Sequence, residues 1–443
     1  MKKILAVYLD RRMLFIFVNG VASGFPWVVI GSALSAWLKD LGLSRTAIGF
    51  FGLVFAVYAL NWLWAPLVDR VRLPLRARLG IGQRRAWLLL TQSALLALIA
   101  AMAWLGPDAN LVFFSLLALG VATASATQDI VVDAYRIDII DAHERDKLPA
   151  AAALATAGWW AGFGYLGALP FFLADTAVAW RGAYWTLAGC MLLFIANTLL
   201  LREPASNRAA VQAAAQRQYE SMLGGGDAVR RAIAWLLTSV LEPLRDFFTR
   251  FGHLAVLLFL FLVFFKIGEA FLGRMSIVFY KEVGFSNAQI GAYSKLAGTT
   301  ATIVFSLLAS VISIHYGLIR GLLIGGAAMA ASNLIFAYMA HVGPDTTVFA
   351  AAILVDNFTS AFSTVAFVAF ISHLTNRAYS ATQYALMASA GNFGRTVFAG
   401  GSGLLVDSLH GDWITFFVIT ALMVIPSLLL LYWIGKKLRY LFE

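Results

Sequence analysis

The chain has 443 residues, of which 61% are hydrophobic and only 13% are charged, against about 45–50% and 25% in soluble domains. Too few polar side chains remain to cover a soluble globule, which excludes a soluble enzyme, a disordered chain and a disulfide-linked secreted domain. A net charge of +10 fits the basic cytoplasmic loops of a membrane protein and does not require a nucleic-acid partner. The composition therefore predicts an all-α polytopic membrane protein.

Twelve apolar runs follow one another along the chain, each long enough to cross a bilayer as a helix of about 20 residues. The first six are predicted at 13–37, 46–68, 86–105, 111–137, 148–172 and 179–201. The last six are predicted at 252–276, 286–312, 318–340, 347–374, 379–405 and 412–435. Polar and apolar residues do not alternate as they would in barrel strands, so we predict twelve transmembrane helices.

A long hydrophilic stretch, residues 202–251, lies midway between the two sets of spans. We interpret it as a cytoplasmic linker between an N-terminal six-helix half, 1–201, and a C-terminal six-helix half, 252–443. Its amphipathic run at about 228–248 fits a helix lying on the membrane surface, and a solvated linker is the alternative. Glycine-rich stretches follow basic turns in the fifth and eleventh spans, which indicates a repeat of the kind that places a transporter's substrate between its halves.

The distribution of basic residues predicts the orientation. Of the 33 lysines and arginines, 25 lie in the termini and loops on the side of the N-terminus, and only four lie in loops on the opposite side. Because basic residues are retained in the cytoplasm, we expect both termini to be cytoplasmic.

Ionisable residues inside spans are costly, so those present usually face a cavity or a partner. They concentrate on four spans of this chain, together with a few amide side chains. The set comprises Asp129, Asp133 and Arg136 in the fourth span, Lys266, Glu269 and Arg274 in the seventh, Asp356 and Asn357 in the tenth, and Asn392 and Arg395 in the eleventh. We interpret it as a polar path through the bundle; salt bridges at a cytoplasmic gate that never touch substrate are the alternative.

Four carboxylates are candidates for carrying a coupling proton, because a carboxylate beside another charge changes protonation readily when its access to water changes. They are Asp129, Asp133, Glu269 and Asp356. Trp159, mid-span among glycines, is a candidate for stacking on a sugar ring, and core packing is the alternative.

The segment Ala65–Arg70, followed by Gly82–Arg85, resembles the loop between the second and third helices of the major facilitator superfamily. Here alanine replaces the glycine that precedes the aspartate, and the loop is longer. The resemblance implies that Asp69 latches the two halves together in one conformation. We expect the gate to comprise Asp69, Arg70, Arg84, Arg85 and Arg136.

Three segments resemble AmpG-type muropeptide permeases: Ser125–Arg136, Arg84–Trp87 and Thr375–Leu386. The resemblance extends over most of the chain outside the linker. It implies import of anhydro-muropeptides across the bacterial inner membrane by proton symport, and it places Ala126 and Gln128 at positions that the family needs for activity.

A muropeptide carries sugar rings, amides and peptide carboxylates. We expect the cations Lys266, Arg274 and Arg395 to meet its carboxylates, aromatic side chains to meet its rings, and Gln128, Asn357 and Asn392 to meet its polar groups. No cofactor, metal or nucleic acid is expected, and we expect a monomer.

Three alternatives remain open: a facilitator-type carrier or exporter of another anionic amphiphile, an integral-membrane transferase, and a channel. Against a transferase, the loops hold no His, Asp and Glu cluster with catalytic or metal-ligand spacing. Against a channel, no span repeats a sequence typical of a selectivity filter.

Overall fold

The computed structural model describes nearly all of the chain, and every regular element that it describes is a helix. The described residues are 7–43, 51–74, 80–174, 176–204, 208–223, 227–285, 289–290, 293, 297–399 and 401–437. The prediction of an all-α protein is confirmed.

The helices of the N-terminal half follow the predicted spans in order. They are α2 (Arg11–Ile30), α3 (Ser32–Asp40), η1 (Gly52–Phe55), α5 (Ala56–Leu60), η2 (Asn61–Leu63), α6 (Ala65–Arg70), α8 (Gln83–Leu105), α9 (Leu111–Asp138), η3 (Ala142–Lys147), α10 (Leu148–Ala161), the π-helix η4 (Gly162–Leu166), α11 (Gly167–Ala174) and α12 (Ala179–Leu200).

Two linker helices and the C-terminal half complete the chain. The linker holds α13 (Arg208–Met222) and α14 (Ala228–Phe251). The C-terminal half holds α15 (Leu254–Phe264), α16 (Ile267–Val283), α18 (Gly298–Tyr316), α19 (Leu318–Val342), α20 (Thr346–Leu374), η6 (Arg377–Tyr379), α21 (Ser380–Ala399), α22 (Ser402–Ser408), α23 (Trp413–Leu422) and α24 (Ile425–Lys437).

Among the described residues, nine helical segments are long and apolar enough to cross a membrane. The other three predicted spans are the second and the fifth, which the structure divides into short helices, and the eleventh, which comprises α21 and α22. In the fifth span the division coincides with the π-helix η4, a local widening that is frequent at functional positions. Parts of the predicted second and eighth spans lie outside the described residues.

Helix ends carry the capping residues that local chemistry favours. Asn110 accepts the backbone N–H of Phe113 at 2.9 Å at the start of α9, and Asp345 accepts that of Thr347 at 2.7 Å at the start of α20. Such caps satisfy amides that have no partner within the helix. Gly106 ends α8 with a φ of 68°, a conformation that glycine adopts without steric cost.

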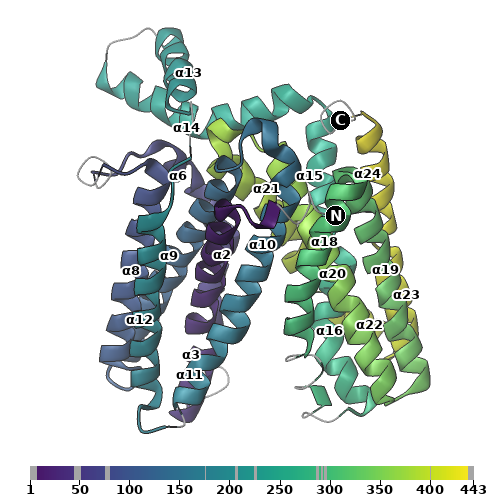
Figure 1. Ribbon diagram of the computed structural model, residues 1–443. Helices are drawn as coiled ribbons and strands as arrows, with labels where there is room; N and C mark the ends of the chain where they lie inside the picture. Colours follow the sequence, from purple (N-terminus) through teal and green to yellow (C-terminus); the bar gives the residue numbers. More distant parts are fainter. Residues whose placement is uncertain are drawn as a thin grey trace.

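The helices form two bundles side by side, with the N-terminal half on the left of Figure 1 and the C-terminal half on the right. We keep the proposed boundaries 1–201 and 252–443 for these halves. A large apolar cluster around Phe25, Phe114 and Tyr184 lies wholly in the first half, and one around Phe279, Phe336 and Phe417 lies wholly in the second. The linker helices α13 and α14 lie at one end, which we call the linker face.

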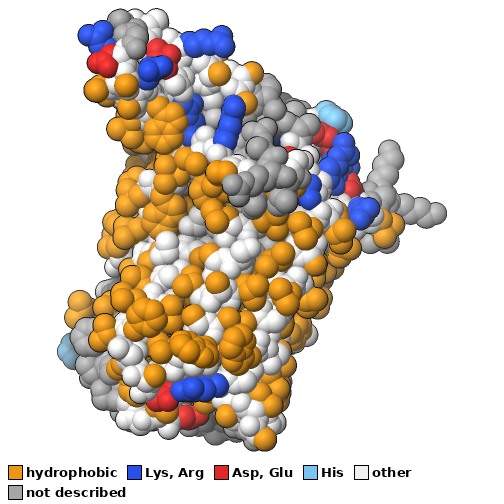
Figure 2. Space-filling view, turned by 90° about the vertical axis from the view of Figure 1, so that its left-hand side faces the viewer, with side chains coloured by type: hydrophobic (Ala, Val, Ile, Leu, Met, Phe, Trp, Pro, Cys, Tyr) orange, Lys and Arg blue, Asp and Glu red, His pale blue; other side chains and the backbone are white. Residues whose placement is uncertain are grey.

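The surface of the bundle is that of a protein surrounded by lipid. Figure 2 shows a broad apolar middle, with charged side chains gathered toward the two ends. Large apolar side chains are exposed along α8, α9 and α12, among them Trp104 (75%), Leu116 (56%) and Leu193 (70%). In water these patches would be unstable, whereas in a bilayer they contact acyl chains.

Glycines bring α2 and α10 into backbone contact. A Cβ atom added at Gly24 would overlap the carbonyl oxygen of Trp159, and one added at Gly158 would overlap that of Phe17. Small residues allow such close approach between membrane helices, where packing and not the hydrophobic effect holds helices together.

Substituting Gly24 by alanine is therefore expected to destabilise the N-terminal half by about 1–3 kcal/mol, because the overlapping backbones must move apart. The control is Gly189→Ala, since a Cβ at Gly189 meets no heavy atom within 4 Å. Thermal unfolding of the purified variants gives the measurement. Equal melting temperatures for the two variants would contradict the backbone contact.

Candidate functional site

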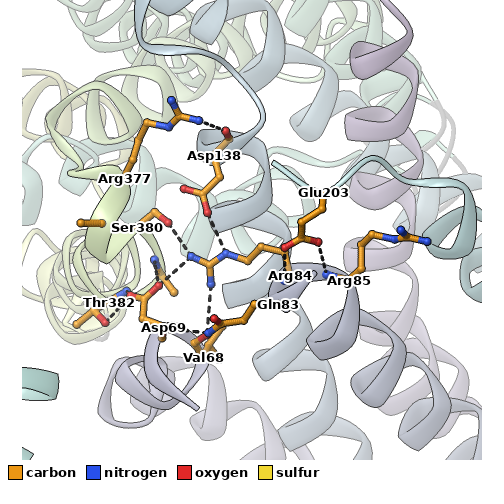
Figure 3. Close-up of polar contacts among 12 residues, drawn as sticks. Val68, Asp69, Gln83, Arg84, Arg85, Asp138, Glu203, Arg377, Ser380 and Thr382 are labelled. Carbon is orange, nitrogen blue, oxygen red and sulfur yellow. Dashed lines mark hydrogen bonds and ion pairs between the residues drawn. The ribbon is translucent and has the colours of Figure 1, made fainter. Parts of the chain in front are cut away.

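A buried arginine joins the two halves at the linker face. Arg84, at the start of α8, donates from Nη2 to Asp69 Oδ1 at 2.8 Å and to Ser380 Oγ at 2.8 Å, and from Nε to Asp138 Oδ2 at 2.9 Å (Figure 3). The side chains of Arg84, Asp69 and Asp138 are each only 1% exposed. One guanidinium thus binds two carboxylates of its own half and one hydroxyl of the other.

Asp69 also caps a helix of the opposite half. Its carboxylate accepts the backbone N–H groups of Ala381 at 3.3 Å and Thr382 at 2.9 Å, and the Thr382 hydroxyl at 2.8 Å. These amides open α21, where unpaired N–H groups and the helix dipole favour a negative charge. Asp69, Arg84, Asp138, Ser380 and Thr382 are called the latch below.

A second arginine crosses between the halves nearby. Arg136 donates to Asp133 Oδ1 at 2.9 Å within α9 and to Ser372 Oγ at 2.8 Å on α20. Its guanidinium also lies 5.1 Å from the ring centroid of Tyr384 on α21, a cation–π distance. Arg377 of the C-terminal half donates to the main-chain carbonyl of Asp138. Polar contacts between the halves therefore concentrate at the linker face.

Two of the five residues predicted for the gate bind elsewhere. Arg85 donates to the carbonyl oxygens of Thr198 at 3.2 Å and Leu199 at 2.7 Å, so it caps the end of α12 within its own half. Arg70 donates to Gln216 Oε1 at 2.6 Å in the linker helix α13. Adjacent residues on a helix point about 100° apart, which separates Arg85 from Arg84 and Arg70 from Asp69.

The linker contacts both halves beside the latch. The backbone oxygen of Gln212 accepts from Arg70 of the N-terminal half at 3.3 Å, while its side-chain amide donates to the carbonyl of Ala378 at 3.0 Å. Gln383 of α21 donates to Asp246 Oδ2 of α14 at 2.8 Å. The predicted amphipathic run is thus one helix, α14, and it packs against the gate. Its predicted contact with the membrane surface stays a prediction.

Asp129 forms the polar centre of the N-terminal half. The Ser23 hydroxyl of α2 donates to its carboxylate at 2.6 Å, and Tyr58 lies within electrostatic range of it. Ala126 and Gln128, predicted to bind substrate, are fully buried, and Gln128 donates to the carbonyl of Ala22 at 2.7 Å. In this conformation these two residues pack α9 against α2 and do not reach an accessible surface.

Lys266 forms the polar centre of the C-terminal half, at the break between α15 and α16. Its ammonium donates to Glu269, to Ser363 Oγ at 2.7 Å and to Thr364 Oγ1 at 2.8 Å. Glu269 in turn accepts the Ser360 hydroxyl at 2.8 Å. The lysine predicted to bind substrate is only 4% exposed and fully engaged.

Arg395 of α21 lies beside this centre. Its Nη2 is 3.9 Å from Glu269 Oε1, and 46% of its side chain is exposed. Asp356 accepts from Ser332 Oγ at 3.4 Å, and Asn357 accepts from Thr302 Oγ1 at 2.6 Å.

The two other predicted substrate-binding residues of the C-terminal half stand apart. Arg274 and Asn392 are both exposed. Neither bonds to another residue that the structure describes. The structure therefore brings Lys266, Glu269 and Arg395 together and leaves these two outside the cluster.

The two centres occupy matching positions along the helices of the two halves. Ser23 is twelve residues beyond the first residue of α2, and Lys266 is twelve beyond that of α15. Asp129 is eighteen residues beyond the first residue of α9, and Thr364 is eighteen beyond that of α20. At each pair of matching positions one half holds a hydroxyl and the other holds a charged group: Ser23 matches Lys266, and Thr364 matches Asp129.

Ion pairs at the start of α2 stay charged at physiological pH. Arg12 donates to Glu144 Oε2 at 2.6 Å and to Asp10 Oδ2 at 2.6 Å. The guanidinium lowers the pKa of Asp10 to about 2 and, with Lys147, that of Glu144 to about 2. A carboxylate with so low a pKa does not exchange a proton near neutral pH, so neither residue is a candidate proton carrier.

Sequence reasoning did not identify the hydroxyl groups that complete both centres and the polar contacts at the linker face. They are Ser23, Ser360, Ser363, Thr364, Ser372, Ser380 and Thr382. Serine and threonine inside helices commonly bond their own backbone, so their positions carry no signal without the neighbouring helix. The segment Thr375–Leu386 was recognised by resemblance, but its contact with Asp69 and Arg136 appears only in the fold.

Comparison with known proteins places the chain among transporters. It is 33% identical over 437 residues to the anhydromuropeptide permease of Escherichia coli (strain K12), covering 98% of this chain and 82% of that protein. It is 31% identical over 445 residues to the putative transporter AmpG 4 of Rickettsia conorii, covering 99% and 100%. No family model matches the sequence.

Solved structures of low sequence identity share the fold. The proton:xylose symporter XylE of the major facilitator superfamily superposes with a TM-score of 0.64 at 18% identity, covering 97% of this chain and 95% of that one. The human organic anion transporter MFSD10 superposes with a TM-score of 0.60 at 15% identity, covering 95% and 98%. The predicted major facilitator fold is confirmed.

Proposed function

This chain belongs to the AmpG family of anhydromuropeptide permeases, and from that premise we propose that it imports anhydro-muropeptides from the periplasm into the cytoplasm by proton symport. The ligand would be a GlcNAc-anhydroMurNAc-peptide released from the cell wall. The observation that carries the proposal is the pair of polar centres at matching helix positions in the two halves. A substrate site between the halves near the midplane is what alternating access requires.

The latch closes one side of the transporter in one state of the transport cycle. With the linker face in the cytoplasm, as the basic loops predict, the contacts of Asp69, Arg84 and Arg136 close the cytoplasmic side. Opening that side breaks all of them. The proposed cycle therefore alternates between this state and one in which α21 has left Asp69.

The four candidate proton carriers have different surroundings. Asp133 is held by Arg136 in the closed state, so its proton exchange is tied to the opening of the latch. Asp129, Glu269 and Asp356 lie deeper, each accepting a hydroxyl hydrogen bond. No cation among the described residues forms an ion pair with Asp129 or Asp356, and a proton would neutralise a carboxylate held within the membrane. Of these two we propose Asp129 as the first carrier, because it forms the polar centre of the N-terminal half.

The remaining assignments follow from the same proposal. The chain is a multi-pass membrane protein, which we place in the bacterial inner membrane with both termini cytoplasmic. It would work as a monomer, without a cofactor, as a transporter and not as a transferase.

Uptake into liposomes tests the proposal. The protein is reconstituted, an inward proton gradient is imposed, and uptake of labelled GlcNAc-anhydroMurNAc-peptide is measured. We expect accumulation that collapses when a protonophore is added. Uptake insensitive to the protonophore would contradict symport, and no uptake of this ligand would contradict the substrate.

A further inference from the structure

Aromatic rings of the N-terminal half gather one helical turn from Ser23, which belongs to its polar centre. The ring centroid of Trp27 lies 4.8 Å from that of Phe55, 4.6 Å from that of Tyr58 and 5.7 Å from that of Trp159. Trp159 in turn stacks on Phe163 at 5.2 Å. Ser23, which binds Asp129, is one helical turn from Trp27. Five helical segments, α2, η1, α5, α10 and η4, thus place their rings together near this carboxylate.

This aromatic cluster adjoins the interface between the halves and contains a free donor. Tyr165, two residues beyond Phe163, is 3.3 Å from Thr300 of the other half. The indole N–H of Trp27 is buried and bonds to no residue that the structure describes. A buried indole N–H normally finds a partner, and a ligand hydroxyl or carbonyl would supply it. Apolar faces with a few polar groups are typical of sites that bind sugar rings.

The C-terminal half offers an accessible cation in place of rings. Arg395 is 46% exposed, and its nearest described carboxylate, that of Glu269, lies at 3.9 Å. Lys266 is 4% exposed and holds Glu269 together with two hydroxyls. The guanidinium of Arg395 is therefore accessible to an incoming anion, whereas the ammonium of Lys266 is not.

The helix that carries Arg395 lines the interface between the halves. Thr382, at its start, binds Asp69, and Ser389, two turns further, lies 3.4 Å from Asn61 of the N-terminal half. Arg395 follows nearly two turns beyond. A guanidinium is suited to a carboxylate because it donates two parallel hydrogen bonds.

We propose that the ligand has a fixed polarity in the site: its sugar rings pack on the Trp27 and Trp159 cluster of the N-terminal half, and a peptide carboxylate binds Arg395 of the C-terminal half, taking the place of Glu269. This inference rests on the proposed function. Lys266 is then a positioning residue that holds Glu269, and Glu269 remains bound to Lys266 and Ser360 when Arg395 turns to the ligand.

Binding measurements with two ligands test this polarity. The purified protein in lipid nanodiscs is titrated calorimetrically with GlcNAc-anhydroMurNAc-tripeptide and with the same compound whose peptide carboxylates are amidated. Arg395→Gln is expected to weaken binding of the acid by about 10-fold or more, the size of a charge-assisted hydrogen bond, and to leave Kd for the amide unchanged. Trp27→Ala is expected to weaken the binding of both ligands by the same factor.

Matched controls separate these effects from general damage. Arg181→Gln removes an exposed arginine that pairs with Asp108, and Trp185→Ala removes an exposed tryptophan of α12; both should retain wild-type Kd values. Arg395→Lys should recover part of the preference for the acid, because it restores the charge without the paired donors. Trp27→Phe keeps a ring if Trp27→Ala does not fold.

The outcomes distinguish the two proposals. If Arg395→Gln weakened the binding of both ligands equally, or did not weaken the binding of the acid, the proposed orientation of the ligand would be overturned. Trp27 variants that bind both ligands like the wild type would overturn the assignment of the rings. Wild-type protein that binds neither ligand would contradict the proposed function instead.

Discussion

Substituting Arg84 by glutamine is expected to destabilise the protein by about 3–5 kcal/mol, the cost of leaving buried charges without their partner. Arg84 is the only described cation that binds both Asp69 and Asp138, and all three side chains are 1% exposed. Glutamine cannot neutralise two carboxylates. We expect a lower melting temperature and, because Ser380 also loses its donor, a shift away from the state closed at the linker face.

The neighbouring arginine provides the control. Arg85→Gln loses hydrogen bonds to the carbonyls of Thr198 and Leu199 but leaves no carboxylate unpaired, so its effect should be about 1 kcal/mol. Scanning fluorimetry gives the melting temperatures. A cysteine placed at Thr382 and probed with a membrane-impermeant thiol reagent reports opening. Equal melting temperatures for the Arg84 and Arg85 variants would rule out the latch as a major source of stability.

Substituting Asp129 by asparagine is expected to abolish accumulation driven by the proton gradient while leaving exchange of ligand across the membrane intact. Asparagine can still accept a hydrogen bond from Ser23, but it cannot gain or lose a proton. The loss should therefore appear in concentrative uptake and not in counterflow of labelled ligand into liposomes preloaded with unlabelled ligand.

Asp108→Asn serves as the matched control, since Asp108 pairs with Arg181 at an exposed position away from the polar centres. Its uptake should equal that of the wild type. If Asp129→Asn retained concentrative uptake, the role of proton carrier would pass to Asp133, Glu269 or Asp356. The same assay applied to the corresponding variants of these three residues would identify the carrier. Loss of counterflow as well would indicate a role for Asp129 in binding.

The candidate site was predicted unevenly from the sequence. Charges inside apolar spans are rare enough to be conspicuous, so Lys266, Glu269 and Arg395 were identified and the structure brings them together. Gln128 was assigned to substrate by resemblance, yet its amide bonds the backbone of α2. A polar residue in a helix looks the same in sequence whether it faces a neighbouring helix or a passage between the halves.

The sequence by itself determined that this protein is a membrane-spanning bundle, which helices carry its charges and which family it resembles. Those properties depend on composition and on apolar runs of bilayer length, and both are local. Only the tertiary structure decided that Asp69 caps α21, that Arg84 and not Arg85 joins the halves, and that Arg395 is accessible whereas Lys266 is engaged. Each of these depends on residues tens to hundreds of positions apart, whose meeting is set by helix packing and not by sequence spacing.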